Sequence, residues 1–175
     1  QVHAFLFRLR RLFAVAIGCQ RSRAALFSGP LDVACARYAI DTPIRMAMFL
    51  SQIGHESGAL RYVAELWGPT PAQSRYEGRA DLGNLQPGDG HRYKGRGLIQ
   101  TTGRANYVRL RDRLRARGVD CPDFEAEPEQ LEHPRWAALS AADYWDMRQI
   151  NAAADAGDFE RVTKLVNGGL NGQDD

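Results

Sequence analysis

Two glutamates that lie nine positions apart have the residue type and the spacing for hydrolytic chemistry. Glu56 ends the segment Gln52-Ile53-Gly54-His55-Glu56, and Glu65 follows after Ser57 and Gly58. A pair of carboxylates is the minimum equipment for hydrolysing a glycosidic bond. An enzyme that inverts the anomeric centre holds the two carboxyl groups roughly 6.5–9.5 Å apart, so that a water molecule fits beneath the sugar ring.

This pair can cooperate only if the helix that carries Glu56 stops soon after it. In one continuous helix, residues nine positions apart are separated by about 13.5 Å along the axis and by about 900° of rotation, which puts them on opposite faces. Gly58 allows the helix to end, because glycine readily adopts the conformation found after helix C-termini. Glu56, at the end of a core helix, is then the candidate acid, and Glu65, beside a loop, is the candidate base. The spacing alone also fits two ordinary surface glutamates.

Uncharged polar side chains downstream offer the donors and acceptors that sugar hydroxyls and N-acetyl groups require. The candidates are Gln100, Thr102, Asn106 and Asn167. Capping competes with this role, since Thr102 comes just before a predicted helix and Asn167 precedes two glycines. His55 has two equally open interpretations: it orients Glu56, or it caps the end of the helix.

Residues 66–97 show neither a helical nor a strand period and are rich in Gly, Pro, Asp, Asn and Arg. A loop of this length in a compact domain is either functional or disordered. Its aromatic residues, Trp67, Tyr76 and Tyr93, favour an ordered loop that faces a ligand. Its arginines suit carboxylate groups, and they are Arg75, Arg79, Arg92 and Arg96.

The remaining segments predict six to eight short helices and no β-rich stretch. A break is expected at Ser28-Gly29-Pro30, followed by a short helix over 31–38. Thr42 is the candidate N-cap and Pro43 the first residue of a helix that runs to about residue 55. The buried face of that helix is expected at Ile44, Ala47, Met48, Leu50, Ser51 and Glu56. Further helices are predicted over 104–117, 136–146 and 159–166.

Residues 1–30 are expected to form a separate basic and apolar segment ahead of a catalytic domain over 31–175. The apolar run after Arg11 resembles a secretory signal but is short, and the apolar residues of 5–17 follow a helical period. We therefore expect an amphipathic helix and no convincing signal peptide. No segment reaches the roughly 20 apolar residues of a membrane span, so no stable membrane insertion is expected.

The composition predicts a soluble globular protein with one sizeable core, at 175 residues, 44% hydrophobic and 25% charged. A net charge of +2 argues against a strongly basic nucleic-acid binder. Cys19, Cys35 and Cys121 have no CxxC spacing, which predicts neither a disulfide framework nor a zinc site.

Four motifs stand in a fixed order between residues 54 and 169. They are Gly54-His55-Glu56-Ser57-Gly58, then Glu65, then Tyr93-Lys94-Gly95-Arg96-Gly97-Leu98-Ile99-Gln100-Thr101-Thr102-Gly103-Arg104-Ala105-Asn106-Tyr107, and Val166-Asn167-Gly168-Gly169. Together they resemble glycoside hydrolase family 19, which contains chitinases of plants and bacteria and many bacteriophage endolysins. Weaker likeness begins near residue 31.

The resemblance implies a mainly α, lysozyme-like fold with two helical lobes and a central substrate cleft. It implies hydrolysis with inversion of β-1,4 bonds next to N-acetylglucosamine or N-acetylmuramic acid, with no metal or other cofactor. Glu56 would be the general acid, and Glu65 would activate water. The candidate substrate-binding residues are His55, Tyr93, Arg96, Gln100, Thr102, Asn106 and Asn167.

Three departures from the family pattern bear on these roles. Plant members place the second carboxylate further along, at about the distance of Glu77, which is therefore the rival base. Some phage members carry a threonine two residues after the second acid, where this chain has Trp67, so another group must hold the water. Plant chitinases have a further sugar-binding arginine after the Asn-Gly-Gly turn, which this chain lacks before Asp175, and the terminal helix is expected to be truncated.

Peptidoglycan is the expected substrate, because the arginines of the loop suit its carboxylates, whereas chitin is neutral. The loop also resembles those of phage and prophage proteins more than those of plant chitinases. The sequence also has no chitin-binding module and no plant-type cysteine framework. We expect an endolysin-type monomer that acts on the bacterial cell wall, in the periplasm or outside the cell after release from the host cytoplasm. A chitinase is the alternative, and a non-catalytic sugar-binding relative is the second. A further hypothesis, membrane disruption by residues 1–19, predicts lysis by the isolated peptide.

Overall fold

The structure is a computed structural model that describes residues 17–167. Over this range the chain is mostly helical and has no strand, and the β pairing consists of isolated bridges from Arg96 to Ala64 and to Thr101. The helices are α2 (Arg21–Arg37), α3 (Pro43–Glu56), α4 (Pro71–Ser74), η1 (Ala80–Leu82), α5 (Asp89–Arg92), α6 (Arg104–Ala116), η2 (Pro128–Glu132), α7 (Pro134–Met147), α8 (Ile150–Asp155) and α9 (Phe159–Asn167). The prediction of a mainly α fold is confirmed. The helix predicted over 5–17 and the membrane-active segment 1–19 lie almost wholly outside the described residues.

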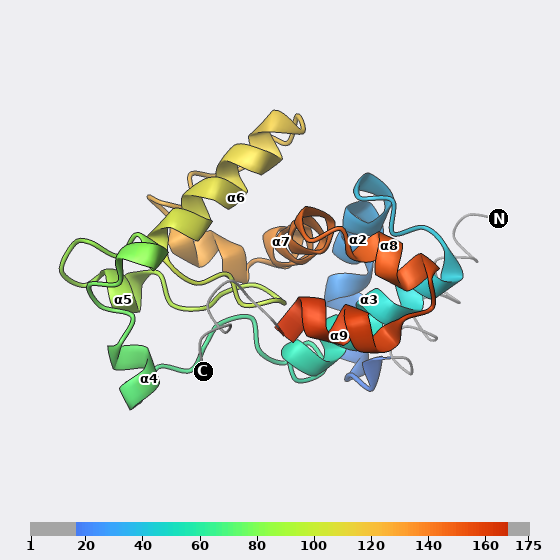
Figure 1. The fold of residues 1–175 in the computed structure, drawn as a ribbon, viewed down its shortest axis with the longest axis horizontal. Helices are drawn as coiled ribbons and strands as arrows, with labels where there is room; N and C mark the ends of the chain where they lie inside the picture. Colours follow the sequence, from blue (N-terminus) through green and yellow to red (C-terminus); the bar gives the residue numbers. More distant parts are fainter. Residues whose placement is uncertain (1–16, 168–175) are drawn as a thin grey trace.

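Helix α7 lies in the middle of an elongated molecule (Figure 1). At one end α2 packs against α7, and α3 packs against α8 and α9. At the other end lie α4, α5 and the first turns of α6, joined by irregular segments. Helix α6 contacts both η1 and α7, so it links the two parts. Within the described residues, no helix is long and apolar enough to cross a membrane.

Helix α2 runs straight through the break that Ser28-Gly29-Pro30 predicted, so that prediction is wrong. Pro30 has no N–H to donate and costs about 3 kcal/mol in a helix interior. Phe27 and Leu31 are almost fully buried on the same face, and burial of each contributes about 1.5–3 kcal/mol. This burial against α7 outweighs the cost of the proline. Helix α2 therefore crosses the position at residue 30 where a domain boundary was placed.

Helix α3 begins as predicted but buries a different face. Thr42 accepts a hydrogen bond from the Arg45 N–H at 3.3 Å, and Pro43 is the first helical residue. The buried residues are Phe49, Gln52 and Ile53, whereas Ile44, Ala47 and Ser51 are exposed. Apolar residues occur on several sides of this helix, so its periodicity does not define one face. Contacts with α8 and α9 select the face instead.

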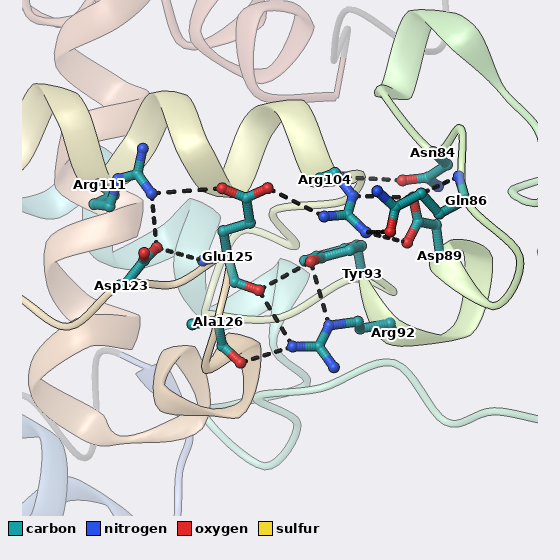
Figure 2. A network of polar contacts seen from close by, with 10 residues as sticks. All are labelled: Asn84, Gln86, Asp89, Arg92, Tyr93, Arg104, Arg111, Asp123, Glu125 and Ala126. Atoms are coloured by element: carbon teal, nitrogen blue, oxygen red, sulfur yellow. Dashed lines mark hydrogen bonds and ion pairs between the residues drawn. The ribbon is translucent and has the colours of Figure 1, made fainter.

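The segment between α3 and α6 is ordered by buried polar contacts, as its aromatic residues predicted. Asp89, which is 2% exposed, pairs with Arg104 at 2.6 Å, and Arg104 also pairs with Glu125 at 3.1 Å (Figure 2). The Asn84 side chain accepts a hydrogen bond from the Arg104 N–H at 2.9 Å. This network fixes the loop to the start of α6, where the candidate sugar-binding residues lie.

Candidate active site

A cavity of about 250 Å³ opens between the two parts of the molecule. Its walls come from the end of α3, the segment 99–102, α6, α7 and the end of α9. The lining residues are Glu56, Ile99, Gln100, Thr101, Thr102, Asn106, Arg109, Leu110, Arg113, Ser140, Tyr144, Met147, Arg148, Val166 and Asn167. The structure therefore gathers Glu56 and all four of the uncharged candidates, Gln100, Thr102, Asn106 and Asn167, around one cavity.

The turn after Glu56 ends α3 where the sequence predicted. Gly58 has φ +57°, and a Cβ there would lie 2.9 Å from the Tyr62 ring. Ala59 and Leu60 also have positive φ, at 60° and 61°, a conformation that costs a non-glycine residue roughly 1–2 kcal/mol. Two hydrogen bonds hold this strained turn: the Leu60 N–H donates to Ser57 Oγ at 2.9 Å, and Arg23 Nε donates to the Leu60 carbonyl at 2.7 Å. Strain of this kind concentrates at functional sites.

The Glu56 side chain is half-buried and faces the cavity. Among residues 17–167 it neither accepts a hydrogen bond nor forms an ion pair. Glu56 lies near Tyr144: burial raises the pKa of Tyr144, the Arg148 charge lowers it, and the ionised form of Glu56 raises it. The Glu56 carboxyl group therefore faces the cavity and makes no hydrogen bond or ion pair with the described residues.

Glu65, by contrast, is held by three donors. Gln73 Nε2 donates to Oε1 at 3.0 Å and the Tyr76 hydroxyl donates to Oε1 at 3.3 Å, while the Gly95 N–H donates to Oε2 at 3.1 Å. All three groups donate, which suits an ionised carboxylate because that group only accepts hydrogen bonds. Burial raises the pKa of Tyr76, and the Glu65 charge adds to the effect.

Glu56 and Glu65 border the same open hollow, which adjoins the cavity. Its volume is about 300 Å³, and its lining is Glu56, Tyr62, Ala64, Glu65, Leu66 and Gln100. Gln100 belongs to both spaces and connects them. Both glutamates are half-buried, so burial does not distinguish the candidate acid from the candidate base. The hydrogen bonds do distinguish them.

Glu77, the rival base, has a different environment. Its Oε1 accepts from the Gly88 N–H at 2.6 Å, and its Oε2 accepts from the Gly90 N–H at 2.8 Å. A Cβ at position 90 would lie 2.8 Å from the Glu77 carboxylate, so the loop needs glycine there. Glu77 lines neither the cavity nor the hollow that holds Glu65. Its contacts are those of a residue that orders the loop.

Gly95 explains how Gln100 and Thr102 reach the site. A Cβ at position 95 would lie 2.3 Å from Gln100 Oε1 and 3.2 Å from Thr102 Oγ1, so only glycine leaves room for both side chains. Thr102 donates to the Gln100 carbonyl at 3.2 Å, and Asn106 donates to the Thr102 carbonyl at 2.7 Å. Helix α6 has no side-chain cap, so Thr102 does not play the capping role that competed with sugar binding.

Three predicted site residues lie away from these spaces. His55 is exposed and lines neither one. Tyr93 is 1% exposed, and its hydroxyl donates to the Glu125 carbonyl at 2.9 Å (Figure 2). Arg96 is 8% exposed and pairs with Glu132 at 2.8 Å. Tyr93 and Arg96 therefore make contacts within the protein and line neither the cavity nor the hollow.

The arginines of the cavity are not those that the sequence suggested. Arg79 pairs with Asp81, and Arg92 donates to the Ala126 carbonyl at 2.7 Å. The guanidinium groups on the cavity wall belong instead to Arg109, Arg113 and Arg148. A helical spacing from Asn106 to Arg109 and Arg113, and from Tyr144 to Arg148, was the signal that could have found them.

Gln73 was also missed. It is 4% exposed, and besides Glu65 its side chain binds the Leu66 carbonyl and accepts from the Gly68 and Thr70 N–H groups. Thr70 and Gln73 form a capping box at the start of α4. A threonine followed by a glutamine three residues later is the sequence signal for such a box, but it gives no hint of the contact with Glu65.

No metal-ligand cluster of three or more His, Cys, Asp or Glu side chains occurs in the described part of the chain. The three cysteines are free. Cys35 is buried, and burial raises the pKa of its thiol to about 12. The polar groups that line the cavity are thus carboxyl, amide, hydroxyl and guanidinium groups.

Comparison with known proteins agrees with this arrangement. No family model matches the chain. A Haemophilus influenzae protein described as a glycosyl hydrolase family 19 domain-containing protein is 33% identical in an alignment 160 residues long, and the alignment covers 75% of this chain and 74% of that protein. The chain belongs to glycoside hydrolase family 19. The resemblance read from the four motifs is confirmed.

A solved structure supports the fold of this family 19 chain. Chitinase C from Streptomyces griseus superposes with a TM-score of 0.64 at 22% identity, over 93% of this chain and 66% of the chitinase chain. At this identity the likeness establishes the fold, which is lysozyme-like and mainly helical as predicted. Membership of family 19 and this fold both support a glycoside hydrolase.

Proposed function

We propose that this chain hydrolyses β-1,4 bonds in the glycan strands of peptidoglycan, with inversion at the anomeric carbon. The observation that carries the proposal is the shared hollow of Glu56 and Glu65. Two carboxyl groups border one open hollow: one has no hydrogen-bond partner among residues 17–167, and the other is held by donors. Such a pair meets the requirements of an acid and a base.

In the proposed reaction, Glu56 donates its proton to the glycosidic oxygen and the leaving sugar departs with that proton. Glu65 accepts a proton from a water molecule, which attacks the anomeric carbon from the opposite side of the ring. Glu56 ends ionised and Glu65 ends protonated, so a proton returns between them through solvent before the next cycle. The three donors to Glu65 fix its oxygens in place, and such preorganisation lowers the cost of reaching the attack geometry.

The uncharged residues are proposed to bind the sugar. Gln100, Thr102, Asn106 and Asn167 lie around the cavity next to Glu56. Gln100 also borders the hollow of Glu65, so it is well placed to hold the attacking water in place of the threonine that some phage members carry. Hydroxyl and amide groups match both the donors and the acceptors of an N-acetylated sugar.

The charge of the cavity favours peptidoglycan over chitin. Its lining includes one carboxyl group, Glu56, and three arginines, of which Arg113 is paired with Asp143. Guanidinium groups pair well with carboxylates. Peptidoglycan carries carboxylates on its peptides and on those lactyl groups that bear no peptide, whereas chitin has none. We accordingly propose an endolysin-type, bacteriolytic enzyme that acts as a monomer on the bacterial cell wall. A chitinase is the second candidate, because the structural neighbour with this fold is named as one.

Parallel digestion decides between these functions. Purified sacculi and colloidal chitin are incubated with the wild type, Glu56→Gln and Glu65→Gln, and the new reducing ends are identified. We expect release from sacculi and a loss of about 10²–10⁴-fold in each variant, because each removes a proton-transfer group. Release from chitin alone would replace peptidoglycan by chitin, and no release from either by the wild type would favour a non-catalytic sugar-binding relative.

A further inference from the structure

Arg148 has an unusual environment among the cavity residues. It follows the last residue of α7, is half-buried, and its guanidinium carbon lies 4.9 Å from the centre of the Tyr144 ring. Its Nε is buried and has no acceptor within residues 17–167. In the same part of the chain, Arg148 forms no ion pair with any carboxylate.

The other arginines near the site have their charge satisfied or exposed to solvent. Arg113 pairs with the buried Asp143 at 2.6 Å, and Arg96 pairs with Glu132 at 2.8 Å. Arg109 is exposed and donates to the Asn106 side chain at 3.2 Å. Arg148 therefore differs from its neighbours, because it is the half-buried guanidinium of the cavity without a carboxylate partner among the described residues.

A buried donor without an acceptor is costly, and the cost is recovered when a ligand supplies the acceptor. The cation–π contact with Tyr144 restrains the guanidinium, whose donors form a planar fork. Such a fork matches the two oxygens of a carboxylate. Glu56, the carboxylate that shares the cavity, makes no ion pair with Arg148, so the fork remains available to a ligand.

We propose that Arg148 binds a carboxylate of an acidic, muramic-acid-containing substrate and thereby selects peptidoglycan glycan over neutral N-acetylglucosamine polymers. This inference rests on the proposed function, since it assigns a substrate group to one residue of the same cavity. The carboxylate belongs either to the lactyl group of a sugar without a peptide or to the peptide of a sugar that bears one. Arg148 is a specificity residue in this scheme and transfers no proton.

The test compares Arg148→Gln with Arg135→Gln. Arg135 lies in the first turn of α7, and its guanidinium carbon is 4.3 Å from the centre of the Trp136 ring. It forms no ion pair among the described residues and does not line the cavity. Each change is made in the Glu56→Gln background, and binding is measured by calorimetry. The ligands are muramic-acid glycan fragments with free lactyl carboxylates, the same fragments bearing peptides, and N-acetylglucosamine oligomers.

We expect Arg148→Gln to reduce the preference for acidic over neutral ligands by about 10- to 100-fold, the usual loss for one charge-assisted hydrogen bond or a bidentate pair. Arg135→Gln should leave the preference as it was, and both variants should keep the parent melting temperature. A loss confined to the stripped fragments assigns the lactyl carboxylate, and a loss confined to the peptide-bearing ones assigns the peptide. An equal loss for neutral and acidic ligands, or no loss, overturns the proposal.

Catalysis by the wild type separates this inference from the proposed function. If the wild type cleaves sacculi but Arg148→Gln keeps the full preference for acidic ligands, the enzyme assignment stands and the role of Arg148 is refuted. If the wild type cleaves no sacculi but acidic ligands still bind in an Arg148-dependent way, the function is refuted and the carboxylate site stands.

Discussion

Gln73 gives the clearest way to perturb the proposed base without touching it. Its amide nitrogen donates to Glu65 Oε1 at 3.0 Å and to the Leu66 carbonyl at 2.7 Å, and its oxygen accepts from the Thr70 N–H at 2.8 Å. Gln73→Glu keeps the shape of the side chain and the accepting oxygen. It replaces the donor with a negatively charged oxygen that faces the Glu65 carboxylate.

The size of the effect follows from the distance between the two charges. Two like charges about 4 Å apart repel by about 1 kcal/mol in water and by about 4 kcal/mol near a protein surface. Because Glu65 is half-exposed, the lower and middle parts of this range apply, which corresponds to about one to two pH units. The added negative charge favours the protonated form of Glu65. Glu65 must be ionised to accept a proton, so the acidic limb of the kcat/KM profile moves to higher pH by that amount.

The assay is a pH profile of sacculus hydrolysis for the wild type, Gln73→Glu and the matched control Gln130→Glu. Gln130 also donates to a glutamate, Glu127 Oε2, at 3.1 Å, but it lies on η2 away from the cavity. The control should leave the profile unchanged. An unshifted acidic limb in a folded Gln73→Glu enzyme, or an equal loss of activity at every pH, would refute the role of Glu65 as the base.

Three further outcomes are expected. Glu77→Gln should lower the unfolding free energy by about 1–2 kcal/mol, since it weakens two hydrogen bonds to loop amides, and it should leave kcat near the wild-type value. A large loss of kcat at an unchanged melting temperature would make Glu77 the base instead of Glu65. Gly95→Ala should displace Gln100, because Gln100 Oε1 would lie 2.3 Å from the new Cβ. We expect kcat/KM to fall by at least about tenfold with little change in melting temperature, and full activity would show that Gln100 is not needed. Gly29 lies within α2, and a Cβ there would meet nothing within 4 Å. Gly29→Ala should therefore raise the unfolding free energy by about 0.5–1 kcal/mol, and a fall in thermal stability would contradict the continuous helix.

The sequence identifies those parts of the site that depend on local conformation. The end of α3 after Glu56 could be predicted, because Gly58 signals positive φ whatever surrounds it. The strained conformation of Ala59 and Leu60 could not, since neither residue type favours it and distant contacts such as that from Arg23 impose it. Pro30 shows the same limit for a helix: a local rule predicts a break, and burial of the neighbouring residues overrides it.

The partners of the arginines are decided by tertiary structure and could not be predicted. Arg96 lies within a catalytic motif, but it pairs with Glu132, which is 36 positions away. Asp143 lies 30 positions from Arg113 and neutralises it. Arg148, in contrast, is left with no carboxylate in the described part of the chain. The ion pairs formed in the folded protein therefore decide which guanidinium group remains available to a ligand.

The anomeric form of the first product tests the proposed inverting mechanism most directly. Soluble peptidoglycan glycan strands are digested inside an NMR spectrometer, and the anomeric proton signals of the new reducing ends are followed before mutarotation. Attack by a water molecule that Glu65 activates, with protonation of the leaving group by Glu56, predicts that the α-anomer appears first from the β-1,4 bond. Initial release of the β-anomer would contradict the pairing of Glu56 and Glu65 across a water molecule.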